Sequence, residues 1–225
     1  MTEVPVIAID GPGGAGKGTV AQQVAERLGW HLLDSGSLYR ITAYAAGQAG
    51  IDLQDSAAVS EVALNLDVRF ADGAGGVRVL LSGNDVTDAI RSEEAGRAAS
   101  IVARDSAVRE ALIARQRAFA ESPGLVADGR DMGSVVFCDA KLKIFLTASV
   151  EERARRRYKQ LKDKGMDVSL PALSRDMAER DRRDSEREVA PLRATQDARV
   201  LDTTELDVQA VTDQVMDWAA EVYSL

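Results

Sequence analysis

The stretch VPVIAIDGPGGAGKGT, residues 4–19, decides the fold of this chain of 225 residues. Its first six residues form an almost uninterrupted apolar run, which is typical of a central parallel strand buried on both faces. The glycine-rich segment that follows excludes a helix there, and apolar side chains then recur at helical spacing from Lys17 to Leu28. Gly29 is expected to end that helix. The succession of strand, glycine loop and helix predicts an α/β protein.

Short apolar runs recur further along the chain, each followed by a loop and by helical periodicity. They lie at residues 31–33, 125–127, 142–146 and 200–201. Together with the first run they predict a five-stranded parallel sheet with flanking helices on both faces. Helices are expected at about residues 37–49 and 208–223.

The segment between the second and third runs has a different pattern. Residues 66–70 and 77–81 alternate or nearly alternate apolar and polar side chains, with Gly73, Gly75 and Gly76 between them. That pattern predicts an antiparallel hairpin. We expect the hairpin to be the centre of an inserted subdomain of about residues 60–103, made of small antiparallel β-structure plus helix.

Residues 11–19 carry the G-x-x-x-x-G-K core of a phosphate-binding loop. In such a loop backbone N–H groups converge on a β-phosphate at the positive end of the next helix, and Lys17 reaches the β- and γ-phosphates. Gly18 stands where the strict pattern has Ser or Thr, so Thr19 contacts Mg²⁺ either directly or through water. A structural turn without a ligand is the alternative. The residues predicted to bind ATP are Gly11, Pro12, Gly13, Gly14, Ala15, Gly16, Lys17, Gly18 and Thr19.

Composition and charge exclude several classes of protein. The formal net charge of −8 argues against a nucleic-acid-binding protein, which would normally be basic. No stretch approaches the roughly 20 apolar residues that span a bilayer, and the first apolar run lacks the basic flank of a signal peptide. Cys138 is the only cysteine, which excludes an intrachain disulfide and a cysteine-based zinc site. We expect a buried thiol at Cys138 and a cytoplasmic location, with no membrane and no nucleic acid as partners.

Positive charge nevertheless gathers in two places, at residues 153–157 and 180–187. An acidic protein that concentrates arginine in this way is expected to bind a small, multiply charged anion there. Two solvated helix faces are the alternative interpretation of such charge runs.

Four separated motifs together resemble the bacterial cytidylate kinases, over nearly the whole chain. They are IDGPGGAGKGT at 9–19, LLDSGSLYR at 32–40, ADGRDMGSVVF at 127–137 and ERDRRDSEREVAPL at 179–192. The resemblance implies Mg²⁺-dependent phosphorylation of CMP and dCMP with ATP by a monomeric P-loop kinase. It also implies one domain, residues 1–225, made of a core, a CMP-binding insertion and a mobile helical lid. The core would be at about 1–59, 104–150 and 185–225, the insertion at about 60–103 and the lid at about 151–170.

The resemblance further implies a CMP site whose side chains suit the parts of the nucleotide. Arg40 and Arg130 would hold the phosphate, since a guanidinium can bond it in a bidentate way. Asp131 would accept a hydrogen bond from the cytosine amino group, and Arg109 would donate to the ring acceptors. The residues implied are Ser35, Arg40, Ser100, Arg109, Arg130, Asp131, Arg180, Asp184 and Arg187.

Plainer interpretations stay open at several of these positions. Arg180, Asp184 and Arg187 are spaced i, i+4, i+7 on one helical stripe, which a structural ion-pair ladder explains as well. In the family, Asp184 with Arg180 contacts the sugar hydroxyls and Arg187 the phosphate. Arg40 as a surface arginine and Ser100 as an ordinary helix serine are the alternatives there.

Catalysis is expected to consist of positioning and charge stabilisation, because the CMP phosphate oxygen is already anionic and needs no strong base. His31 is therefore expected to be an ordinary strand residue near the core edge. Asp128, which ends a predicted strand, is expected to orient Mg²⁺ through water together with Thr19, with helix capping as the alternative. The expected catalytic residues are Lys17, Arg130, Arg153, Arg156, Arg157 and Arg187.

Two other functions are compatible with a phosphate loop. One is a P-loop kinase with a different acceptor, such as UMP, AMP or shikimate. The other is a nucleotide-dependent switch without transferase activity, although the N-K-x-D motif of guanine-nucleotide switches is absent from the sequence.

Overall fold

The computed structural model describes residues 4–71 and 78–224. The chain divides into two compact units. The first joins the residues up to Asp34 to those from Arg117 onward, and the second is Ser35–Gln116. The second unit is therefore an insertion in the chain of the first.

The first unit contains a five-stranded sheet in which every pair of neighbours is parallel, in the order β2-β6-β1-β7-β8. The strands are β1 (Val6–Asp10), β2 (His31–Asp34), β6 (Leu125–Gly129), β7 (Leu142–Thr147) and β8 (Arg199–Asp202). All five apolar runs are strands, so the predicted parallel sheet is confirmed. Because β1 is central, the glycine loop follows the middle of the sheet at its carboxyl edge, where ligands of α/β proteins bind.

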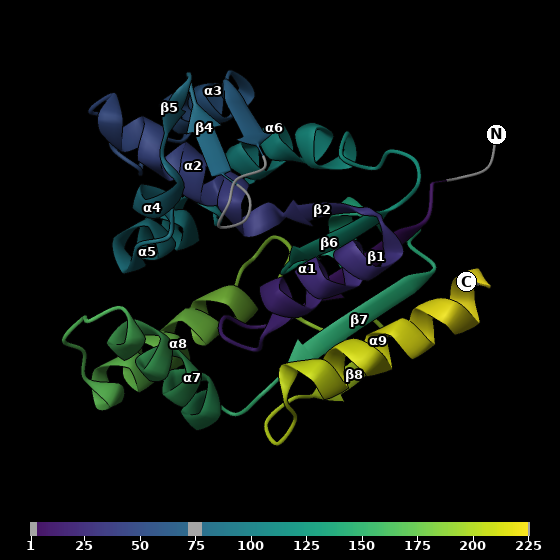
Figure 1. Cartoon of the computed structure of the whole chain (residues 1–225). Coiled ribbons are helices and arrows are strands. Elements are labelled where there is room, and N and C mark those ends of the chain that lie inside the picture. The colour runs from purple at the N-terminus through teal and green to yellow at the C-terminus, as the bar shows by residue number, and fades with distance from the viewer. Residues whose placement is uncertain (1–3, 72–77, 225) are drawn as a thin grey trace. The chain divides into compact units, whose positions relative to one another are not determined.

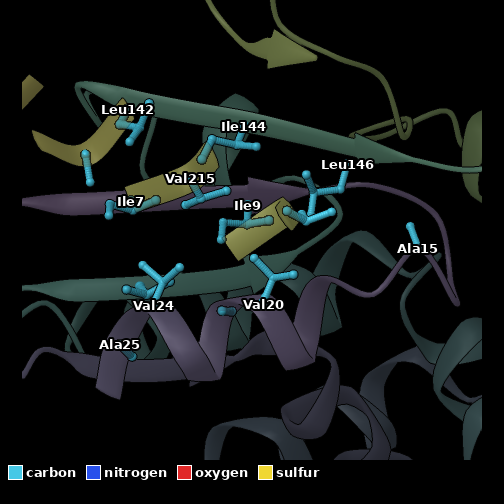
Figure 2. Packing of buried hydrophobic residues seen from close by; sticks show 14 residues of the cluster. Ile7, Ile9, Ala15, Val20, Val24, Ala25, Leu142, Ile144, Leu146 and Val215 are labelled. Atoms are coloured by element: carbon cyan, nitrogen blue, oxygen red, sulfur yellow. The ribbon is translucent and has the colours of Figure 1, made fainter. Parts of the chain in front are cut away.

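Helices α1 (Lys17–Leu28) and α9 (Val208–Tyr223) cover one face of this sheet, as Figure 1 shows. The strand period of two sends Ile9 of β1 toward these helices. Figure 2 shows Val20 of α1 and Val215 of α9 packed in the same apolar cluster. All three side chains are at most 1% exposed, so this layer is a continuous core. Both helices have the bounds that their periodicity predicts.

The opposite face of the sheet receives η1 (Met132–Val136), a single turn of π-helix that follows β6. Met132 is fully buried. A Cβ at Gly133 would lie 3.1 Å from Cγ of Lys143 in β7, so the backbone of this turn lies close against the strand. Single π-turns of this kind are often found at functional sites.

Two further helices of the first unit follow β7. They are α7 (Val150–Asp163) and α8 (Leu170–Ser185). They pack on each other through a small apolar cluster of Ala154, Leu161 and Leu173.

The second unit combines helices with a three-stranded antiparallel sheet in the order β3-β4-β5. Its strands are β3 (Val68–Ala71), β4 (Arg78–Leu81) and β5 (Asn84–Asp85), and its helices are α2 (Ser35–Gln48), α3 (Ser56–Leu64), α4 (Thr87–Ile90), α5 (Glu93–Val102) and α6 (Ser106–Arg117). The predicted antiparallel pair is confirmed, with a third, short strand added. The connection predicted at Gly73, Gly75 and Gly76 lies outside the described residues. The insertion expected at 60–103 falls inside this unit.

Cys138 corrects one expectation from the sequence. Its thiol is exposed rather than buried, because it lies in the loop between η1 and β7 and not in a strand. His31 begins the edge strand β2, where it is exposed and its Nε2 lies 3.0 Å from the carbonyl oxygen of Ser122. In the part of the chain that the structure describes, no helix is long and apolar enough to cross a membrane.

Candidate active site

The glycine loop begins where β1 ends and lies directly against β7. A Cβ at Gly11 would lie 2.0 Å from the carbonyl oxygen of Leu146, so no side chain fits at this position. Gly14 and Gly16 have φ angles of 81° and 89°, in the left-handed region that favours glycine. Gly16 immediately precedes α1, so the loop ends at the positive end of that helix. This backbone suits a phosphate group.

Lys17, the first residue of α1, is only 5% exposed. Its ammonium group donates to the carbonyl oxygen of Pro12 at 2.9 Å and lies 3.8 Å from Oδ1 of Asp128. Burial, and after it the positive charge of Arg130, lowers the pKa of Lys17. Burial raises the pKa of the Asp128 carboxyl, although Lys17 opposes that shift. Lys17 and Asp128 thus place one ammonium group and one carboxyl group next to the end of the glycine loop.

The surroundings of Asp128 also explain why Gly18 stands where the strict phosphate-loop pattern has Ser or Thr. A Cβ at Gly18 would lie 3.3 Å from Oδ2 of Asp128, so the glycine gives this carboxylate room at the start of α1. Mg²⁺ typically binds one or two carboxylates together with water and phosphate oxygens. The Asp128 carboxylate, next to the start of α1, is chemically suited to such a cation. Among the described residues, no group of three or more His, Cys, Asp or Glu side chains forms a metal cage.

A cluster of arginines lies beside the glycine loop and is organised by one buried carboxylate. Asp184 of α8 accepts from Nε of Arg130 at 3.1 Å and from Nη2 of Arg187. Burial alone would raise the pKa of Asp184, but the guanidinium groups of Arg130, Arg187 and Arg180 lower it on balance. A Cβ at Gly13 would lie 3.4 Å from Nη2 of Arg130 and 3.8 Å from Nη1 of Arg180. Two guanidinium groups therefore lie against the loop itself.

Arg153 of α7 is the arginine most firmly fixed to the loop. It is 3% exposed, and it donates to the carbonyl oxygens of Ala148 at 2.9 Å and Gly13 at 3.0 Å. Both of its Nη atoms also bond to the carboxylate of Asp181 in α8, with Nη1 at 3.1 Å from Oδ1. This bidentate pair connects α7, α8 and the loop.

The other arginines of α7 bond to other groups. Arg156 bonds to Glu152 at 3.0 Å and to the hydroxyl of Thr203, after β8, at 3.2 Å. Arg157 donates to Gln160. Arg155 is exposed and pairs with Glu152. Among these arginines, Arg153 bonds directly to a carbonyl oxygen of the glycine loop. Arg156 is connected to the loop through Thr203.

Asp10 is a site residue that the motifs did not single out. It ends β1 with a side chain that is 7% exposed and accepts the backbone N–H groups of Met132 and Gly133, both at 2.8 Å. These donors begin the turn η1, directly after Arg130 and Asp131. Burial raises the pKa of Asp10 to about 6, against the two backbone donors that lower it. An acidic residue at the end of an otherwise apolar strand is the signal that could have identified it.

Two further residues to which the motifs gave no role, Asp181 and Thr203, support the glycine loop. Asp181 lies inside the arginine-rich motif and holds Arg153. Thr203, which is 1% exposed, donates from its hydroxyl to the carbonyl oxygen of Ala15 at 3.2 Å. Neither contact could be read from spacing, because each joins segments far apart in the sequence.

The second unit holds the remaining residues expected to bind CMP. Ser35 begins α2 and is buried, and Arg40 donates to the carbonyl oxygen of Ile90 at 2.9 Å. Ser100 of α5 is buried, and its hydroxyl has no hydrogen-bond partner among the described residues. Arg109 of α6 is 3% exposed and donates to the carbonyl oxygen of Ala103 at 3.4 Å. A buried hydroxyl without a protein partner, such as that of Ser100, is usually satisfied by a ligand or by water.

The sheet order, the glycine loop on the central strand and the arginines beside it define a P-loop kinase. The fold is similar to that of an uncharacterized protein from Eubacterium ventriosum, with a TM-score of 0.52 at 14% identity over 95% of this chain and 97% of that chain. The chain belongs to the cytidylate kinase family, whose model matches residues 7–221.

Curated relatives agree with this assignment. A cytidylate kinase of Pseudomonas aeruginosa strain LESB58 is 60% identical over 215 residues, covering 95% of this chain and 94% of that protein. A cytidylate kinase of Nitrosococcus oceani is 56% identical over 218 residues, covering 96% of each. The similarity therefore extends over both units of the fold.

Proposed function

We propose that the protein phosphorylates CMP and dCMP with ATP, giving CDP and dCDP, as the names of its relatives suggest. The observation that carries the proposal is the arginine cluster organised by Asp184, which lies beside Gly13 of the phosphate loop. A kinase for nucleoside monophosphates needs one place for a triphosphate and another for a phosphate acceptor. The loop supplies the first, and the cluster suits the second.

The ATP phosphates would be held by the backbone of the glycine loop and by the ammonium group of Lys17. Mg²⁺ would be oriented by Asp128 and Thr19, chiefly through water, and would supply charge neutralisation between the β- and γ-phosphates. Arg153 would add positive charge at the same loop, since it already bonds to Gly13.

On the acceptor side, Arg130 and Arg187 would bind the CMP phosphate, and Asp184 with Arg180 would bind the sugar hydroxyls. Asp131 is expected to accept from the cytosine amino group, which uracil lacks. From the second unit we propose four CMP-binding residues: Ser35, Arg40 toward the phosphate, and Ser100 and Arg109 toward the base.

The reaction itself needs no nucleophile from the protein. An anionic phosphate oxygen of CMP would attack the γ-phosphorus of ATP in line, as the bond to the β-phosphate oxygen of ADP breaks. Charge on the transferred group would be stabilised by Lys17 and by the arginines, with Arg156 and Arg157 contributing if residues 151–170 move as a lid. Such a lid would also exclude water and so prevent hydrolysis of ATP.

We further propose the wider organisation that the family resemblance implies. The chain would act as one domain of 225 residues in the cytoplasm, as a monomer. Its core would comprise about 1–59, 104–150 and 185–225, with residues 60–103 as the CMP-binding insertion.

Coupled assays of ADP formation test the proposal directly. With ATP as donor, CMP and dCMP should be turned over at least about 10-fold more efficiently than UMP, and AMP, GMP and shikimate should give no signal above background. Preference for UMP, AMP or shikimate would assign the protein to a different acceptor. ATP binding without ADP formation on addition of any acceptor would indicate a nucleotide switch instead.

A further inference from the structure

The first unit has a pocket of about 720 Å³ that the proposed reaction does not use. Part of its lining lies at the start of parallel strands: Val6 begins β1, Trp30 directly precedes β2, and Lys141 directly precedes β7. The pocket therefore opens at the amino edge of the parallel sheet. The glycine loop follows the carboxyl end of β1, about 13 Å of strand away. We call this space the amino-edge pocket.

Aromatic side chains gather in the amino-edge pocket although the chain contains few of them. The sequence has two Trp, four Tyr and four Phe, and three of these ten residues, Trp30, Phe137 and Tyr223, line this one space. A volume of this size accommodates a small organic ligand, and ligand sites are typically lined by aromatic and apolar groups with a few polar ones.

The aromatic wall, as we call Trp30, Phe137 and Tyr223, is held in place by the surrounding structure. The rings of Trp30 and Tyr223 meet edge to face with their centroids 5.4 Å apart. The Tyr223 hydroxyl donates to the carbonyl oxygen of Val6 at 2.6 Å, and a Cβ at Gly124 would lie 2.4 Å from the Trp30 ring. A ligand would thus meet rings that are already ordered, which lowers the entropic cost of binding.

The charged side chains of the pocket favour an anion. Arg117 and Lys141 are positive and Asp139 is negative, so the lining has a net charge of +1 in a protein whose formal net charge is −8. The guanidinium plane of Arg117 is fixed, because Nε and Nη2 donate to the carbonyl oxygens of Val136 and Val135 at 2.9 Å and 3.2 Å. Lys141 is exposed at the rim, where its flexible stem can follow a bound group.

We propose that the amino-edge pocket is a second binding site, for a flat aromatic molecule that bears one anionic group. The aromatic wall would hold the ring system, and Arg117 and Lys141 would pair with the anion. This site is separate from the phosphate loop, and the proposal does not depend on which nucleotide the enzyme phosphorylates.

A matched pair of probes tests both parts of the proposal. 8-Anilinonaphthalene-1-sulfonate has the required ring system and charge, and N-phenyl-1-naphthylamine is its uncharged counterpart. Binding would be followed by energy transfer from Trp30 in a Trp218→Phe protein, which contains no other tryptophan. A non-hydrolysable ATP analogue and CMP would be present at saturation to occupy the nucleotide sites.

We expect saturable binding of the sulfonate, with a Kd on the order of 10–100 μM. The uncharged probe should bind about fivefold more weakly. The variant Lys141→Met should weaken binding of the sulfonate about threefold and leave the uncharged probe unchanged. Lys159→Met, which removes an exposed lysine from α7, is the matched control and should change neither.

The single cysteine gives an independent readout. Cys138 is exposed and lines the pocket, so a bound sulfonate should slow its reaction with a disulfide reagent such as DTNB at least twofold. Absence of saturable energy transfer while the nucleotide sites are occupied, or full reactivity of Cys138 at saturating sulfonate, would overturn the site. Equal affinity for the two probes, or an effect of Lys159→Met as large as that of Lys141→Met, would overturn the preference for an anion.

Discussion

The backbone N–H of Gly133 donates to a carboxylate oxygen of Asp10 at 2.8 Å, although 123 residues separate the two in the sequence. With the equal bond from Met132, it connects the end of β1 to the turn that follows Arg130 and Asp131. The buried carboxylate of Asp10, directly before the phosphate loop, therefore fixes the turn next to two residues that are expected to bind the acceptor.

Replacing Asp10 by Asn should impair use of the acceptor more than use of the donor. An amide offers one oxygen in place of two, so one backbone donor loses its partner and the turn shifts. We expect kcat/KM for CMP to fall about 10- to 100-fold, with KM for ATP within about twofold of its original value. Steady-state kinetics with each substrate varied in turn would measure this. Equal losses for CMP and ATP would contradict a positioning role for Asp10.

The raised pKa of Asp10 has a consequence for stability against pH. A buried carboxyl with a folded pKa of about 6 and an ordinary value of 3.8 binds a proton more tightly in the folded protein, so its contribution to stability increases as pH falls through 6. Between pH 7 and pH 5, the unfolding free energy of the original protein should rise relative to Asp10→Asn by about 1 kcal/mol. Urea unfolding of both proteins at the two pH values would measure the difference. A difference that stays constant, or changes with the opposite sign, would show that Asp10 does not titrate in this range.

Lys17→Met should abolish phosphoryl transfer while CMP still binds. Methionine keeps an unbranched apolar side chain, one atom shorter than lysine, but lacks the charge that would face the transferred group, so kcat should fall by about 10³-fold or more. Calorimetry should give a Kd for CMP within about twofold of the original value. Lys164→Met, at an exposed position, serves as the control and should be fully active.

Asp131→Asn tests the assignment of the cytosine edge. Replacing a carboxylate acceptor by an amide should lower kcat/KM for CMP by about 10²-fold, because the base amino group loses a charged partner. KM for ATP should change by less than about twofold. Since Asp131 is 3% exposed, the unfolding midpoint should be recorded alongside to confirm that the variant is folded. If the efficiency with UMP falls by the same factor as that with CMP, Asp131 does not read the base.

Asp181→Asn should reduce turnover through Arg153. The substitution weakens the bidentate pair, so Arg153 would hold the glycine loop less firmly and kcat should fall about 10-fold. Because Arg153 is buried, the loss of its charged partner should also lower stability by up to about 3 kcal/mol. Glu186→Gln is the matched control, because it breaks the exposed pair with Arg182 on the same helix. Turnover of Glu186→Gln should be unchanged, and equal effects of the two substitutions would exclude a specific role for Asp181.

Much of the fold could be predicted from the sequence because its signals are local. The buried strands are continuous apolar runs. Helix α1 shows regular helical spacing between Gly16 and Gly29, and α9 shows it after its capping residue Asp207. The short strand β5 was missed, since two polar residues carry no strand pattern. The exposure of Cys138 was also missed, because a lone cysteine is usually buried and its loop has no sequence signal of its own.

The site was predictable where a motif fixes the backbone, and less so where long side chains choose among partners. The conformation of the loop follows from its glycines. Arg153, Arg156 and Arg157, by contrast, were expected to act together, and the structure shows Arg153 bonded to Gly13 and Arg156 bonded to Thr203, which follows β8. The contacts of Asp10 likewise join β1 to a turn more than a hundred residues away, which no local pattern reveals.

The close approach of Gly11 to Leu146 limits how this sequence can drift. Two central strands would have to separate to admit even a methyl group at position 11, whereas the left-handed end of α1 at Gly29 has open space around it and could accept asparagine. Both glycines have a positive φ, of 146° at Gly11 and 64° at Gly29, yet only Gly29 could be replaced without moving its neighbours.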